Sequence, residues 1–172
     1  MNIITLDVES TIFKYPGEIN PKKKVGHPLA SFNRCVLIGI KAHSTKPVCY
    51  QPLYIDEIQN DLDTSLVVGF NIKFDLHWMR RLGFNVSNWR IWDCQIAEYM
   101  LSSQQNKYPS LNATAESYGL GSKLDVISEE YWEKGIDTDE IPINILEDYL
   151  KQDLELTYQV YLKQLERLCP TT

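Results

Sequence analysis

The alternation of hydrophobic and polar positions along the chain predicts strands and helices in a mixed order. Short runs rich in apolar and β-branched residues indicate five strands, at residues 2–9, 35–42, 47–53, 66–70 and 88–93. Apolar positions at helical spacing indicate helices at residues 56–62, 74–82, 93–101, 111–118 and 144–168. Three strands in succession, followed by helices that alternate with strands, predict an α/β domain.

Two acidic residues stand two positions apart at the end of the first predicted strand. Because side chains alternate between the two faces of a strand, Asp7 and Glu9 are expected to point the same way. Neighbouring carboxylates repel and raise each other's pKa, unless a dication lies between them. The pair therefore indicates either a metal site or two unconnected acids at a solvated strand end.

Two further acids belong to predicted helices. Asp75 falls in the first turn of the helix at 74–82, where an acid also suits the helix dipole. Asp153 lies in the long amphipathic helix at 144–168, and Tyr149 precedes it by one turn on the same side. Carboxylate oxygens are the ligands that hard cations such as Mg²⁺ prefer, and two such ions about 4 Å apart stabilise a phosphoryl displacement. The four acids together indicate a metal-dependent nuclease.

Three motifs follow one another along the chain: Asp7-x-Glu9, Asn71-x-x-Phe74-Asp75 and Tyr149-x-x-x-Asp153. This order resembles the 3′-5′ exonucleases of the DnaQ-like superfamily, in the subgroup (DEDDy) whose last motif carries tyrosine. The similarity is closest to the proofreading exonuclease domain of family A DNA polymerases, including bacteriophage forms. It implies a single exonuclease domain over residues 1–172, with a ribonuclease H-like mixed five-stranded sheet flanked by helices.

The resemblance also implies the roles of particular residues. Two divalent cations, Mg²⁺ or Mn²⁺, are expected to be bound by the four acids Asp7, Glu9, Asp75 and Asp153. Tyr149 is expected to orient the attacking water. The candidate substrate-binding residues are Ser10, Thr11, Phe13, Asn71 and Phe74. The implied reaction removes nucleoside 5′-monophosphates from the 3′ ends of single-stranded DNA, in replication or proofreading.

Three alternatives stay open at this point. Ribonuclease D-like enzymes share these motifs, and nothing in the motifs reports on the 2′ hydroxyl, so RNA is an alternative substrate. A non-catalytic module that binds nucleic acid or a polymerase is the second alternative. The third is a domain excised from a longer polymerase, whereas a free-standing exonuclease would act with a DNA polymerase in trans.

Composition is typical of a globular domain with one core, since 44% of the 172 residues are hydrophobic. The 17 basic and 23 acidic residues give a net charge of -6, which disfavours tight binding to duplexes. Two bound dications would bring that balance to about -2. No apolar run approaches the roughly 20 residues of a membrane span, so a membrane role is not expected.

Scattered cysteines without a Cys-x-x-Cys pair, and an N-terminus without a signal-like segment, predict the cytoplasm of a bacterial or phage-infected cell. Two stretches carry no regular pattern. Residues 10–34 surround a lysine run at 22–24, which is either an ordinary solvated cluster or a contact for the nucleic-acid backbone. Residues 119–142 contain Tyr131 and Trp132, which we expect to anchor the stretch to the core.

Overall fold

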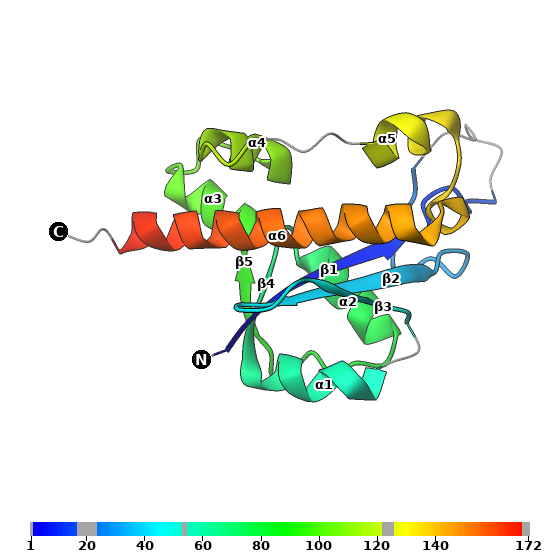
Figure 1. Cartoon of the computed structure of the whole chain (residues 1–172), viewed down its shortest axis with the longest axis horizontal. Coiled ribbons are helices and arrows are strands. Elements are labelled where there is room, and N and C mark those ends of the chain that lie inside the picture. The colour runs from blue at the N-terminus through cyan, green and yellow to red at the C-terminus, as the bar shows by residue number, and fades with distance from the viewer. Residues whose placement is uncertain (1, 17–23, 53–54, 122–125, 170–172) are drawn as a thin grey trace.

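The computed structural model describes residues 2–16, 24–52, 55–121 and 126–169. Within these residues, five strands form one mixed sheet in the order β3-β2-β1-β4-β5 (Figure 1). The strands are β1 (Asn2–Ser10), β2 (Cys35–Ala42), β3 (Val48–Tyr50), β4 (Ser65–Gly69) and β5 (Arg90–Asp93). The central strand, β1, pairs antiparallel with β2 and parallel with β4. The expected α/β fold with a mixed five-stranded sheet is confirmed.

Helices cover both faces of this sheet. One face carries α1 (Ile55–Thr64) and α2 (Lys73–Arg81). The long helix α6 (Ile143–Leu168) crosses the other face, together with α3 (Cys94–Leu101), α4 (Leu111–Ser117) and α5 (Val126–Glu130) (Figure 1). Two short 3-10 turns, η1 (Trp132–Lys134) and η2 (Thr138–Glu140), lie between α5 and α6. Among the described residues, no helix has the length and apolar character of a membrane span.

Strand alternation divides β1 into an apolar face and a polar face. Leu6 and Val8 pack into a core that includes Trp78 of α2. Asp7 and Glu9, at the intervening positions, lie on the opposite face, toward α6. On that face the core is formed by Leu37 of β2 and by leucines of α6. The polar side chains of β1 therefore lie under the long helix.

The parallel strands β1, β4 and β5 end at the same edge of the sheet. The last pair between β1 and β4 joins Thr5 to Val68, so the acidic end of β1 continues beyond its neighbour. Chain direction then reverses from β4 into α2 within a few residues. The first turn of α2 is thereby placed beside the end of β1.

A glycine sets how closely α6 approaches the sheet. Gly39 of β2 pairs with Asp7 of β1. A Cβ atom on Gly39 would lie 2.7 Å from Leu150 Cγ and 2.7 Å from Leu154 Cδ1, both on α6. Because atoms cannot approach this closely, only glycine allows the helix to rest on the strand backbone here. Asp153, the neighbour of Leu154, is held near β1 as a result.

The predicted elements agree with the structure apart from short segments. The third strand is shorter than expected, at Val48–Tyr50 instead of residues 47–53, of which residue 53 lies outside the described residues. Residues 119–142 contain α5, η1 and η2, which were not predicted. These elements have three to five residues, too few to show a helical period, and η2 is fixed by a capping box between Asp137 and Glu140.

Replacing Gly39 by alanine should push α6 away from the sheet. We expect Gly39→Ala to lower the free energy of unfolding by about 1–3 kcal/mol, the usual cost of overpacking a core. Urea unfolding measures this change. Leu154→Val removes one of the contacting methyl groups, so the combined variant should lose less stability than the two single losses added together. Additive losses would show that the contact with α6 does not limit this position.

Candidate active site

Three carboxylates from β1 and α6 converge on one point. One oxygen from each of Asp7, Glu9 and Asp153 lies within 4.8 Å of the others. Glu9 is 9% exposed and Asp153 is 7% exposed, so little water reaches either side chain. The convergence of these three acids, expected from strand alternation and from the third motif, is what the structure shows.

The fourth acid approaches from the first turn of α2. Asp75 is 3% exposed, and its Oδ1 accepts a hydrogen bond of 3.0 Å from the backbone N–H of Val8. This N–H lies past the last pair between β1 and β4, and it also donates to Asp7 Oδ1 at 2.9 Å, so the two carboxylates share it. Asp75 therefore binds the end of β1, instead of facing solvent as a simple partner of the helix dipole.

Burial and neighbouring charge act together on Asp75. Burial raises the pKa of its carboxyl well above the ordinary value near 3.8, and the negative charges of Asp7 and Glu9 raise it further. The backbone hydrogen bond from Val8 opposes this rise, because it favours the charged form. The surroundings of Asp75 thus disfavour its ionisation.

The donor set fits divalent cations. All four side chains offer hard carboxylate oxygens, which suit Mg²⁺ or Mn²⁺. A dication among them would reverse the repulsion that raises the pKa of Asp75. The site can therefore bind positive charge, and through it the oxygens of a phosphodiester.

Tyr149 lies one turn of α6 before Asp153 and is half-buried. Its ring meets the ring of Trp132 edge to face, with centroids 6.1 Å apart and an interplanar angle of 78°. The expectation that Trp132 anchors its segment to the core is confirmed, since it packs against the cluster under α6. The structure also shows that Tyr149 is part of this contact, which sequence reasoning missed.

The candidate substrate-binding residues fall into two groups. Ser10 and Thr11 are buried, and Thr11 Oγ1 accepts a 2.9 Å hydrogen bond from the N–H of Arg34. Phe13 is half-buried, and its N–H donates to Asp137 at 3.2 Å. These contacts hold the loop after β1 in place, so they give these three residues a structural task.

Asn71 and Phe74 border a hollow of about 300 Å³ at the start of α2. Asn71 is exposed, and its φ of 57° is the left-handed conformation that asparagine tolerates better than most residues. The ring of Phe74 packs edge to face on Trp78. The other residues around the hollow are His27, Pro28, Leu29, Lys73 and His77.

A buried aspartate that sequence reasoning passed over ties the loop after β1 to the chain before α6. Asp137 is 1% exposed and accepts hydrogen bonds from the N–H groups of Ile12, at 2.8 Å, and Phe13. It also caps η2 in a capping box with Glu140. The spacing Asp137-x-x-Glu140 was the signal in the sequence.

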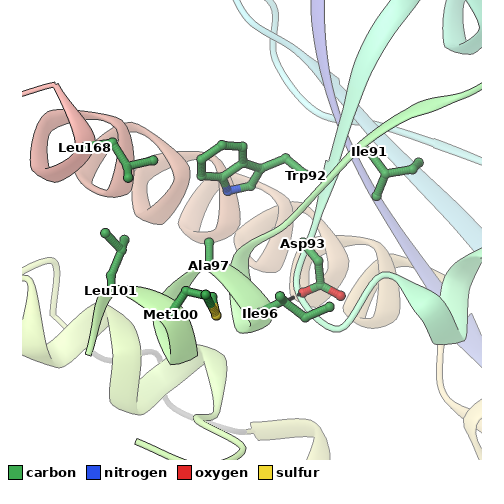
Figure 2. A pocket seen from close by; sticks show the side chains of 8 residues that line it. All are labelled: Ile91, Trp92, Asp93, Ile96, Ala97, Met100, Leu101 and Leu168. Carbon is green, nitrogen blue, oxygen red and sulfur yellow. Dashed lines mark hydrogen bonds between the residues drawn. The ribbon is translucent and has the colours of Figure 1, made fainter. Parts of the chain in front are cut away.

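A separate hollow of about 510 Å³ has none of the four acids on its wall (Figure 2). Apolar side chains of β5, α3 and α6 line it, among them Ile96 and Met100. Asp93 reaches its rim but accepts hydrogen bonds from the N–H groups of Gln95 and Ile96, as the N-cap of α3. The acidic cluster is therefore distinct from this apolar hollow.

An α/β sheet of this order, with acids gathered at the end of its central strand, is the ribonuclease H-like architecture of exonucleases. A family model described as 3′-5′ exonuclease matches residues 24–168. The chain belongs to this family, and its resemblance to DnaQ-like exonucleases is confirmed. The match begins after β1, so Asp7 and Glu9 lie outside it.

Solved structures show the same fold at low sequence identity. NrnC of Brucella melitensis is 13% identical with a TM-score of 0.65, over 96% of this chain and 73% of that chain. The EXO domain of Aedes aegypti Nibbler is 14% identical with a TM-score of 0.63, over 96% and 80%. The family B DNA polymerase of the archaeon Pyrobaculum calidifontis is 15% identical with a TM-score of 0.58, over 95% and 24%. Comparison with curated protein sequences finds no match.

The raised pKa of Asp75 predicts how the metal-free chain responds to pH. Because the folded-state pKa exceeds the unfolded value near 3.8, stability should be lost as pH rises from 3.8 through the folded pKa. Each unit of that difference corresponds to about 1.4 kcal/mol. Asp75→Asn keeps an oxygen that can accept from Val8 but cannot ionise, so the variant should be more stable at pH 7.5 and less dependent on pH.

Urea unfolding at pH 5.5 and 7.5, after removal of metal, measures this effect. Asp61→Asn, which neutralises an exposed acid on α1, is the matched control and should follow the wild type. The wild type should lose more free energy of unfolding than Asp75→Asn when the pH rises from 5.5 to 7.5. An equal loss in the two proteins would contradict the electrostatic strain at Asp75.

Proposed function

We propose that the chain is a metal-dependent 3′-5′ exonuclease that hydrolyses the last phosphodiester bond of single-stranded DNA and releases nucleoside 5′-monophosphates. The observation that carries this proposal is the convergence of acids from β1 and α6, with Asp75 of α2 bound to the end of β1, in a chain of the 3′-5′ exonuclease family. DNA is the first choice because the three motifs resemble those of proofreading domains. RNA is the alternative substrate, since none of these motifs distinguishes a ribose from a deoxyribose.

The four carboxylates would hold two divalent cations, Mg²⁺ or Mn²⁺, with Asp7 shared between them. When bound, such ions lower the pKa of a coordinated water and stabilise charge on the phosphate and on the leaving oxygen. The contribution of the protein is to hold its four acids at fixed positions, through the hydrogen bond from Val8 to Asp75 and the packing of α6 on Gly39.

Tyr149 would direct the attacking water. A tyrosine phenol ordinarily keeps its proton at neutral pH, so it acts as a hydrogen-bond group and not as a general base. Its place one turn before Asp153 puts it on the acidic side of α6. The ring is half-buried and packs against the apolar cluster under α6.

The hollow at the start of α2 would receive the end of the strand. Phe74 offers a ring face or edge to a base, and Asn71 offers an amide at the surface. Lys73 lies on the same wall, and its positive charge suits a phosphate. Ser10, Thr11 and Phe13 would support this hollow from the loop after β1, since a Cβ atom on Gly26 would lie 3.7 Å from both Ser10 Oγ and Phe74 Cζ.

Degradation of 5′-labelled oligonucleotides tests this function. Single-stranded DNA and RNA of one sequence, each in Mg²⁺ and in Mn²⁺, should give a ladder that shortens by one nucleotide at a time. Blunt duplexes should start more slowly, because opening the terminal pair costs a few kcal/mol. Immediate release of the labelled 5′ nucleotide, or cleavage of a closed circle, would contradict exonuclease action from the 3′ end. Faster degradation of RNA would favour the ribonuclease D-like alternative.

Asp7→Asn is the matched inactive control for the same assay. Loss of a shared ligand should lower the rate by about 100-fold or more, while circular dichroism shows an intact fold. A variant that keeps more than about a tenth of the wild-type rate would show that Asp7 is not a shared ligand. An active wild type also separates the enzyme from a module that only binds nucleic acid.

A further inference from the structure

An aromatic side chain from outside α6 packs against the ring of Tyr149. Trp132, in η1, meets its ring edge to face at 6.1 Å. This geometry brings the positive edge of one ring to the negative face of the other and favours one orientation of the pair. The contact restricts the plane of the phenol ring.

Trp132 is itself fixed by two partners. Its indole N–H donates to Thr138 Oγ1 at 3.2 Å, and Thr138 is fully buried in η2. The ammonium of Lys24, on the loop after β1, lies 4.9 Å from the centroid of the indole ring. The indole therefore lies between η2 and the loop after β1. Asp137 joins these two segments, because it caps η2 and accepts a hydrogen bond from Ile12 in the loop.

On another side of Tyr149 the protein leaves space. A hollow of about 190 Å³ lies between α5 and α6, and Tyr149 forms part of its wall. The remaining lining residues are Val126, Ile127, Ile145, Asp148 and Gln152. An aromatic ring beside such a hollow can swing into it when its packing partner is removed. Trp132 thus packs against a side chain that also borders a hollow.

We propose that Trp132 is a positioning residue that acts through Tyr149, and that Lys24 supports Trp132 through its contact with the indole ring. This inference rests on the proposed function, in which the Tyr149 hydroxyl directs the attacking water. Trp132 does not touch the reacting atoms. Its task is to keep the phenol plane fixed, so that the hydroxyl points to the same place in every turnover.

Steady-state kinetics of three variants test the role. Trp132→Ala should lower kcat by about 10- to 100-fold, the cost of misplacing a group by roughly 1 Å, and should change KM for a single-stranded oligonucleotide by less than about two-fold. Trp132→Phe keeps an aromatic ring and should recover most of the rate. Lys24→Met should cost about two- to five-fold, as expected for one exposed cation–π contact.

The decisive measurement combines Trp132→Ala with Tyr149→Phe. If Trp132 acts through the Tyr149 hydroxyl, Trp132→Ala should change kcat by less than about three-fold in a chain that already lacks this hydroxyl. A full additional loss in the double variant would overturn the inference, since it would show an effect that does not pass through Tyr149. Trp132→Leu, which fills part of the same space, repeats the comparison if the alanine variant does not fold.

A second tyrosine of α6, which meets a tryptophan of β5, supplies the matched control. Trp92 meets Tyr161 edge to face, with centroids 5.5 Å apart and an angle of 80°, and its indole N–H donates to Gln164 (Trp92 is shown in Figure 2). Trp92→Ala should cost similar packing and lower the Tm, yet leave kcat near the wild-type value. An equal fall in kcat in Trp92→Ala would assign the effect of Trp132→Ala to general destabilisation and overturn the inference.

Different results would overturn the role of Tyr149 and the role of Trp132. If Tyr149→Phe leaves kcat unchanged, the role given to Tyr149 is wrong, and the inference on Trp132 falls with it. If Tyr149→Phe is slow but Trp132→Ala retains wild-type kcat, only the inference on Trp132 is overturned. Exonuclease activity of the wild type on the same oligonucleotide confirms that the assay reports the proposed function in either case.

Discussion

Four carboxylates that share a buried site are the constraint on which the arrangement depends. Oxygens of Asp7, Glu9 and Asp153 lie within 4.8 Å of one another, and Asp75 is almost fully buried beside them. Burial raises the pKa of Asp75, and the negative charges of Asp7 and Glu9 raise it further. The protein keeps the acids together at a cost to its own stability, and bound cations would remove this cost.

The scaffold resists this repulsion through contacts at the backbone. Gly39 lets α6 rest on β2, and the leucines on either side of Asp153 fix the depth of the helix. The N–H of Val8 binds Asp75 where β4 no longer pairs with β1. Asp137 ties the loop after β1 to η2 and so to the segment that carries Trp132. Local hydrogen bonds and close packing hold the acids in place.

Most of the fold and the acidic site could be predicted because their signals are local. Alternation along β1 places Asp7 and Glu9 on one face, and helical spacing places Tyr149 and Asp153 on one side of α6. Asp75 points inward because β4 stops pairing with β1 before Val8. The position of Asp75 in its helix did not predict this, because a side chain in the first turn can also face solvent. The contact of Trp132 with Tyr149 joins two separate elements, so the periodicity of the sequence does not predict it. The burial of Ser10 and Thr11 follows a shift in the register of β1 after Glu9, which the alternation of the sequence does not indicate.

Calorimetric titration of the metal-free chain with Mn²⁺ tests most directly whether these carboxylates form a cation site. The repulsion among them predicts saturable binding of about two ions per chain, a rise in Tm, and loss of this binding in Asp7→Asn. A folded chain that binds no Mn²⁺ would contradict the proposed site. Unchanged binding in Asp7→Asn and in Asp153→Asn would equally contradict it.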